Sequence, residues 1–153
     1  ISKLPPNERP INTVFQKYAL FPYLNIYDNI AFGLKLKKLP KDVIDEKVRH
    51  VLDVVDLEGF ERRRVHTLSG GQQQRTSIGR ALMTSPLVVL ADEPTGNLDS
   101  KNSQEIIQLL KASNKKYNQT LIVITHDENI ALQADRIIAI EDGGITRDEV
   151  IRG

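Results

Sequence analysis

Residues 87–93 read LVVLADE, a run of five aliphatic residues that ends in two adjacent acids. The length of the apolar run suits a strand, and a short, wholly apolar strand is typical of a parallel sheet. Because ligands of such sheets bind at the carboxyl ends of the strands, Asp92 and Glu93 are candidates for a ligand site. One carboxylate can hold Mg²⁺ and the next can orient a water molecule. Both acids can equally serve only to solvate the end of the strand.

Strands and helices alternate from this run to the C-terminus. The sequence predicts a helix over residues 101–112, a second buried strand over 121–125, a short helix over 127–134 and a third strand over 137–140. Residues 142–144 read DGG, which predicts a turn and a hairpin onto Ile145. We therefore expect the part from about residue 86 to residue 153 to be an α/β unit with a parallel sheet.

The part before residue 86 has mostly helical periodicity. Residues 29–38 and 42–55 each place apolar side chains on one face, and Ser69 is a good N-cap for a helix over residues 71–83. Residues 1–13 are typical of a loop, and a β-branched stretch after them predicts a strand that ends at Gln16. The region from about residue 17 to residue 85 is therefore expected to be a helical subdomain.

Residues 68–72 read LSGGQ at the start of the last of these helices. The hydroxyl of Ser69 and the unobstructed backbone N–H groups of Gly70 and Gly71 could hold a phosphate there. A plain helix cap would use the same residues. The order of this motif and the two acids along the chain favours the phosphate-binding interpretation.

The bulk composition excludes several classes of function. The 153 residues suit one domain, and 21 basic side chains nearly balance 20 acidic ones, so we expect no nucleic-acid partner. The chain has no cysteine, which excludes disulfides and thiolate metal sites. Its apolar runs are far shorter than the ~20 residues that span a bilayer, so contact with a membrane would go through a partner protein.

Five motifs together resemble the ATPase domain of ABC transporters. Residues 68–75, LSGGQQQR, resemble the signature motif, and residues 87–93 resemble the Walker B strand with its catalytic glutamate. Residues 94–99, PTGNLD, resemble the loop that follows Walker B. Residues 125–127, THD, resemble the switch-histidine loop, and Gln16 resembles the glutamine of the Q-loop. Taken singly, a loop histidine or a polar residue at a strand end would be unremarkable, but their order and spacing favour the resemblance.

The resemblance implies the fold, an α/β P-loop NTPase-like core with a parallel sheet and a helical subdomain. It implies ATP and Mg²⁺ as cofactors in the intact domain, with two copies of the domain enclosing the nucleotides. The roles it implies are catalysis by Glu93 and His126, metal binding by Asp92 and Gln16, and nucleotide binding by Gln16, Leu68, Ser69, Gly70, Gly71, Gln72 and Asp99.

The resemblance also implies partners. We expect a second ATPase domain, as a homodimer or a heterodimer, and a transmembrane permease that docks on residues 17–38. Through the permease the protein would lie on the cytoplasmic face of the cell membrane.

The sequence departs from the family pattern in two ways. The phosphate-binding run Gly-x-x-x-x-Gly-Lys-Ser/Thr is not in the sequence, since no glycine precedes Gly33. We therefore expect a partial ATPase domain that lacks the phosphate-loop strand and, by itself, does not hydrolyse ATP. In addition, residues 8–38 resemble a spermidine/putrescine importer, whereas the part from about Arg75 resembles lipoprotein, macrolide or antimicrobial-peptide transporter ATPases. We expect a natural or engineered hybrid, with polyamine import as one possible role.

Two other functions remain open from the sequence alone. The chain could be a non-catalytic interaction module, because without the phosphate loop most of the electrostatic stabilisation of phosphoryl transfer is absent. It could also be an ABC-type ATPase of repair or translation, which the stretch around Gln16 disfavours.

Overall fold

The structure is a computed structural model that describes residues 3–152. In chain order its elements are η1 (Pro6–Glu8), β1 (Ile11–Val14), α1 (Ile26–Leu36), α2 (Lys41–Val54), η2 (Val65–Thr67), α3 (Gly70–Leu82), β2 (Val88–Asp92), α4 (Ser100–Tyr117), β3 (Thr120–Ile124), α5 (Glu128–Ala131), β4 (Arg136–Glu141) and β5 (Gly144–Val150). Each helix and strand expected from the sequence is present, with boundaries that shift by a few residues.

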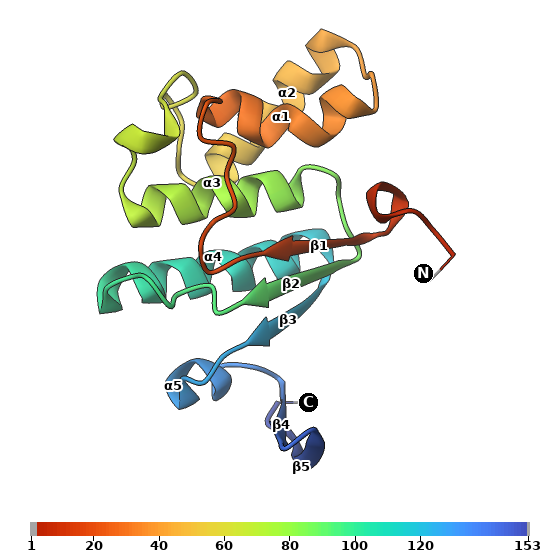
Figure 1. The fold of residues 1–153 in the computed structure, drawn as a ribbon, viewed down its shortest axis with the longest axis vertical. Helices are drawn as coiled ribbons and strands as arrows, with labels where there is room; N and C mark the ends of the chain where they lie inside the picture. Colours follow the sequence, from red (N-terminus) through yellow and green to blue (C-terminus); the bar gives the residue numbers. More distant parts are fainter. Residues whose placement is uncertain (1–2, 153) are drawn as a thin grey trace.

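Three parallel strands form the sheet that carries the predicted ligand edge. Their order is β1-β2-β3 (Figure 1). Val88 pairs with Ile11 on one side and with Thr120 on the other, so the strands run in step and end at the same edge. α4 connects β2 to β3, as parallel neighbours require. The segments that follow the three strands therefore lie side by side.

Helices cover one face of this sheet. α3 contacts β1 and α4 contacts β3. α1 packs on the other side of α3, so α1 and α2 form a second layer beyond α3 and α4 (Figure 1). The space between these layers is filled by aliphatic side chains, including Val14, Ile30, Leu52, Ile78 and Ile106. One continuous core thus joins the helical part to the sheet, as the predicted α/β fold requires.

Side-chain caps fix where α1 and α3 begin. The Asn25 side chain accepts a hydrogen bond from the backbone N–H of Asp28 at 2.7 Å and so starts α1. Ser69 Oγ accepts from the backbone N–H of Gln72 at 3.2 Å, while Gln72 Oε1 accepts from the backbone N–H of Ser69 at 3.0 Å. This reciprocal capping box starts α3 and confirms Ser69 as the N-cap.

The prediction of a buried strand over residues 121–125 is wrong for one of its two faces. Ile122 and Ile124 are 46% and 54% exposed, whereas Leu121 and Val123 pack against the helix-covered core. The reason is the alternation of side chains along a strand, since in the described part of the chain the helices lie on only one face of the sheet.

The C-terminal hairpin is confirmed, but it is not part of the parallel sheet. β4 pairs with β5 in a separate two-stranded antiparallel sheet. The turn between them needs Gly143, whose φ of +78° lies in the left-handed region. At the other end of the chain, β1 ends at Val14, and Gln16 lies in the turn beyond it rather than in the strand.

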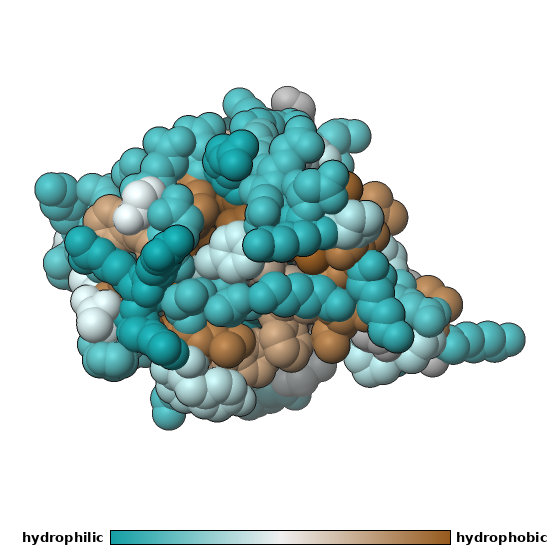
Figure 2. Space-filling model, turned by 90° about the horizontal axis from the view of Figure 1, so that it is seen from above, coloured by the Kyte–Doolittle hydropathy of each residue, from teal (hydrophilic) through white to brown (hydrophobic). Residues whose placement is uncertain are grey.

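The surface of the helical side is largely hydrophilic, with hydrophobic side chains visible between the polar ones (Figure 2). Within residues 3–152 no helix is both long and apolar enough to cross a membrane.

Candidate functional site

The ends of the three parallel strands bring the predicted catalytic residues to one edge. Asp92 is the last residue of β2 and is exposed. The backbone N–H of Glu93 donates to the carbonyl of Ile124 at 2.9 Å, which holds the end of β2 beside the end of β3. His126 follows β3 two residues later, and Gln16 follows β1 at the same edge.

Glu93 and His126 are hydrogen-bonded to each other. Glu93 Oε1 accepts from the backbone N–H of His126 at 3.0 Å and lies 2.7 Å from His126 Nδ1. Because a carboxylate only accepts, the proton of this contact lies on Nδ1. The histidine ring is 87% exposed, whereas the Glu93 side chain is 22% exposed. In this arrangement two nitrogen atoms of His126, in the loop after β3, both contact Oε1 of the Glu93 carboxylate.

The backbone of Glu93 is strained. Its φ is +44°, a left-handed conformation that a residue with a side chain rarely adopts. Such a conformation costs about 1–3 kcal/mol and persists only where surrounding contacts enforce it. Here the hydrogen bonds to the loop after β3 supply part of that constraint.

The contact with Glu93 also changes the acidity of His126. The hydrogen bond to Glu93 and the negative charge of its carboxylate raise the pKa of His126 above its ordinary value. The protonated ring is therefore favoured in the folded chain. The stability that this ion pair contributes is complete below the unfolded-state pKa and is lost as the pH rises through the folded-state pKa.

Replacing Glu93 with glutamine should lower the titration midpoint of His126. The amide keeps the shape of the side chain but removes the negative charge that favours the imidazolium. A pH titration of histidine-labelled protein by NMR measures this midpoint, with Glu141→Gln as the matched control because Glu141 is exposed at the end of β4. The same midpoint in both variants would contradict the pairing.

Gln16 lies against the loop that follows β2. Asn97 Nδ2 donates to the backbone carbonyl of Gln16 at 3.1 Å. A Cβ at Gly96 would overlap the side-chain amide of Gln16, so this close approach requires a glycine at position 96. The turn after β1 and the loop after β2 are therefore packed as one unit beside Glu93.

Asp99 and the predicted signature residues form a second group. Asp99 caps α4 by accepting from the backbone N–H of Asn102 at 2.8 Å, and this hydrogen bond lowers the pKa of Asp99. Asn102 in turn lies against Gly71 of α3. Ser69 and Gln72 cap α3 and make no hydrogen bond to Glu93 or His126 in the described part of the chain. The start of α3 thus lies beside Asp99 and, among the described residues, makes no hydrogen bond to Glu93 or His126.

Leu68 is placed differently from the other signature residues. Its side chain is 7% exposed and packs in the core, so only its backbone could face a nucleotide.

The described residues fit a magnesium ion that arrives with a phosphate ligand. Asp92 offers one exposed carboxylate at the strand edge, and residues 3–152 contain no group of three acidic, histidine or cysteine side chains that could hold a metal ion by themselves. Mg²⁺ is typically bound by one or two carboxylates together with substrate phosphates and water. Asp92 therefore suits a metal that the nucleotide helps to hold.

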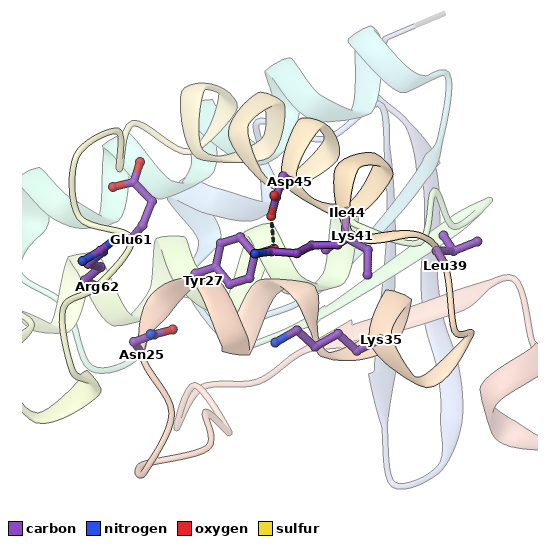
Figure 3. A pocket seen from close by; sticks show the side chains of 9 residues that line it. All are labelled: Asn25, Tyr27, Lys35, Leu39, Lys41, Ile44, Asp45, Glu61 and Arg62. Carbon is purple, nitrogen blue, oxygen red and sulfur yellow. Dashed lines mark hydrogen bonds between the residues drawn. The ribbon is translucent and has the colours of Figure 1, made fainter.

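A pocket of about 540 Å³ lies in the helical part (Figure 3). In it Asp45 points toward Tyr27, whose hydroxyl donates to the carboxylate, and burial together with this bond raises the pKa of Tyr27 to about 12. Its lining residues are Asn25, Tyr27, Lys35, Leu39, Lys41, Ile44, Asp45, Glu61 and Arg62. None of the predicted nucleotide-site residues lines this pocket.

Sequence reasoning missed three side chains that hold the site together. Asn97 binds the backbone of Gln16, Arg80 Nη1 donates to the carbonyl of Ala19 at 2.7 Å, and Gln74 reaches two loops from within α3. Gln74 could have been found, because it lies in series with Gly71 and Ile78 on the buried face of the predicted helix, where a polar side chain needs a partner.

Comparison with known proteins gives a consistent family. Residues 2–96 match the model of a family described as ABC transporter. A spermidine/putrescine import ATP-binding protein, PotA, of Clostridioides difficile (strain 630) is 57% identical over 146 residues, which are 95% of this chain and 42% of that protein. The protein of the same name from Acetivibrio thermocellus is 49% identical over 149 residues, 97% of this chain and 42% of the relative.

Solved structures agree with this comparison. The dimeric ATP-binding cassette MJ0796, in a post-hydrolysis state bound to ADP and Pi, matches with a TM-score of 0.82 and 38% identity over 96% of this chain and 65% of that one. The cbiO1 protein of Clostridium perfringens, part of the ABC transporter complex cbiONQ, matches with a TM-score of 0.87 and 32% identity over 93% of this chain and 57% of that one.

The expected hybrid origin is not supported. The relatives named spermidine/putrescine import proteins match both halves of the chain in single alignments that cover at least 95% of it. The residues from about Arg75 onward therefore need no second source. The chain spans about 42% of the length of these relatives.

Proposed function

Because this chain belongs to the ABC transporter family, we propose that it is part of the ATP-binding and ATP-hydrolysing subunit of a polyamine importer. The observation that carries the proposal is the pairing of Glu93 with His126 at the ends of two adjacent parallel strands. The similarity to PotA proteins along nearly the whole chain supports spermidine or putrescine as the transported substrate.

The geometry supports a division of roles along the sheet edge. Asp92 would hold Mg²⁺, which would neutralise phosphate charge, and Glu93 would orient the attacking water once His126 releases its carboxylate. His126, whose Nε2 is not used in the contact with Glu93, would bind the terminal phosphate through that nitrogen. Gln16 would supply an amide oxygen to the same metal ion, and its contacts with Gly96 and Asn97 would couple it to the loop that carries Asp99.

The start of α3 serves a second copy of the domain. The Ser69 hydroxyl and the backbone N–H groups at the N-terminus of α3 favour an anion, and they do not bond to the catalytic pair of their own chain. In a dimer these groups would face the phosphates bound by the partner copy. The dimeric form described for the similar cassette MJ0796 supports this arrangement.

Residues 17–38 are the proposed docking surface for a permease. Two large apolar side chains in this segment are unusually open to solvent, Tyr23 at 70% and Leu36 at 66%. Asn25, Tyr27 and Lys35 of the same segment line the pocket of Figure 3, which could receive part of a partner. Membrane association at the cytoplasmic face then follows from the permease.

Transport by the reconstituted complex tests the proposed function. The complete protein, assembled with its permease in membrane vesicles, should take up radiolabelled spermidine when ATP is present and fall to background with a non-hydrolysable ATP analogue. A polypeptide of these 153 residues alone should show no turnover, because the sequence contains no phosphate-binding run.

Each other outcome points to a rival function. ATP hydrolysis by the complete protein without permease binding or uptake would indicate an ABC-type ATPase that acts outside transport. A complete protein that neither binds nor hydrolyses ATP would indicate the non-catalytic interaction module.

A further inference from the structure

The side-chain amide of Gln74 joins two loops that belong to different strands. Gln74 lies in the middle of α3 and is fully buried. Its Nε2 donates to the carbonyl of Pro94 at 2.6 Å and lies 3.4 Å from the carbonyl of Phe15. Because both partners are carbonyl oxygens, the orientation of the amide is fixed, with nitrogen toward the two loops.

The two carbonyls belong to the chain neighbours of two site residues. Pro94 follows Glu93 directly, and Phe15 precedes Gln16 directly. One buried amide therefore links the backbone next to Glu93 to the backbone next to Gln16. Glu93 also has the strained φ of +44°, so a constraint on Pro94 acts directly beside a strained residue.

The amide of Gln74 is used on its donor side only. The Oε1 atom of Gln74 is buried and has no hydrogen-bond partner among the described residues. An unpaired buried acceptor destabilises the folded state, and an apolar side chain of the same length would avoid that penalty. The same apolar side chain would leave the carbonyl of Pro94 without its donor. What the amide adds is the donor that reaches both loops.

We infer that Gln74 is a positioning residue that links α3 to the loops carrying Gln16 and Glu93, so that the signature helix and the catalytic edge move together. This inference rests on the proposed function for its catalytic part. It adds a coupling between residues 69–72 and the Glu93 carboxylate of the same chain. Residues 69–72, at the start of α3, are the ones proposed to serve the partner copy. A shift of α3 on contact with a nucleotide bound by the partner copy would then move the backbone at Pro94 through the Gln74 side chain.

The test replaces Gln74 with methionine in the complete protein. Methionine keeps the length of the side chain and removes both the donor and the unpaired acceptor. The carbonyl of Pro94 loses its partner, which should lower the stability modestly and leave the complete protein folded. With the loops no longer tied, kcat for ATP should fall about 10- to 100-fold while KM for ATP stays within about twofold. This split separates lost positioning from lost nucleotide binding.

Hydrogen exchange provides a readout that needs no activity. The backbone N–H of Gly96 donates to Glu93 and that of Tyr18 donates to Phe15, each at 3.1 Å, and both bonds lie in the tied loops. In Gln74→Met these two amides should exchange faster, while amides within α3 keep their protection. Gln73→Met is the matched control. Among the described residues the Gln73 side chain bonds only the nearby carbonyl of Leu68, at 3.2 Å, so its replacement should leave both loops unchanged.

The outcomes separate this inference from the proposed function. Unchanged kcat with unchanged exchange at Gly96 and Tyr18 would overturn the coupling while leaving the ATPase proposal intact. Exchange that is faster throughout α3 to the same degree as at Gly96 and Tyr18 would also overturn it, because it would show only a general loss of stability. If the parent protein hydrolyses no ATP, the proposed function fails, and hydrogen exchange in Gln74→Met alone tests the link between the loops. Faster exchange at Gly96 and Tyr18 would then support the link, and unchanged exchange would refute it.

Discussion

In the complete protein, Glu93→Gln should bind ATP as the parent does and lose hydrolysis by about 10²- to 10⁴-fold, the usual effect of removing a general base. The amide preserves the volume and the contact with the loop after β3 but cannot accept a proton from the attacking water. Binding should persist because the groups proposed to hold the nucleotide, Asp92 and the start of α3, are untouched. Steady-state phosphate release and equilibrium binding of a fluorescent ATP analogue measure the two effects separately.

Glu46→Gln is the matched control for that experiment. Glu46 lies on the exposed side of α2, far along the chain from every predicted site residue, so the same change of charge there should leave turnover unaltered. Full turnover in Glu93→Gln would remove Glu93 from the role of water-orienting base. Loss of turnover in both variants would mean that turnover depends on the net charge of the protein and not on the position of Glu93.

The second large effect is expected on stability. Ile78→Ala should reduce the free energy of unfolding by about 2–5 kcal/mol, because it removes three carbons from a fully buried site and leaves a cavity. Ile78 belongs to α3, the helix that contacts α1, α2, α4 and β1, so neighbouring side chains have little freedom to close the space. Urea unfolding followed by circular dichroism measures the loss.

Ile145→Ala gives the comparison on the surface. Ile145 is 67% exposed in β5, and the same truncation there should change the free energy of unfolding by less than about 0.5 kcal/mol. Equal losses in the two variants would contradict the assignment of the core.

Local chemistry explains which parts of the fold could be predicted. The capping box of Ser69 and Gln72, the turn at Gly143 and the helices before residue 86 depend on neighbours within a few positions. Sequence patterns report such neighbours directly. The apolar run at 121–124 was misjudged because such a run gives no sign of which face will be covered, and the cover comes from helices elsewhere in the chain.

The residues of the candidate site could be predicted from local motifs, but the contacts between them could not. Glu93 and His126 could be named from the motifs, but their hydrogen bond depends on the register between β2 and β3, which pairs Asp92 with Ile124. The bonds of Gln74 join residues 20 and 59 positions apart, and no local pattern encodes which carbonyl a buried amide will reach. Polarity on a buried helix face signals a partner without identifying it.

The pairing of β1 with β2 has a consequence for the synthesis of the chain. Ile11 pairs with Val88, 77 positions later, and all three larger helices of the first half are made in between. At about 5–20 residues per second the ribosome needs roughly 4–15 seconds to cover that distance. During this interval β1 cannot yet pair with β2, and the hydrogen-bonding edge that β2 will cover is open to other nascent chains. Early binding by a chaperone near residues 11–14 would shield that edge until Val88 emerges.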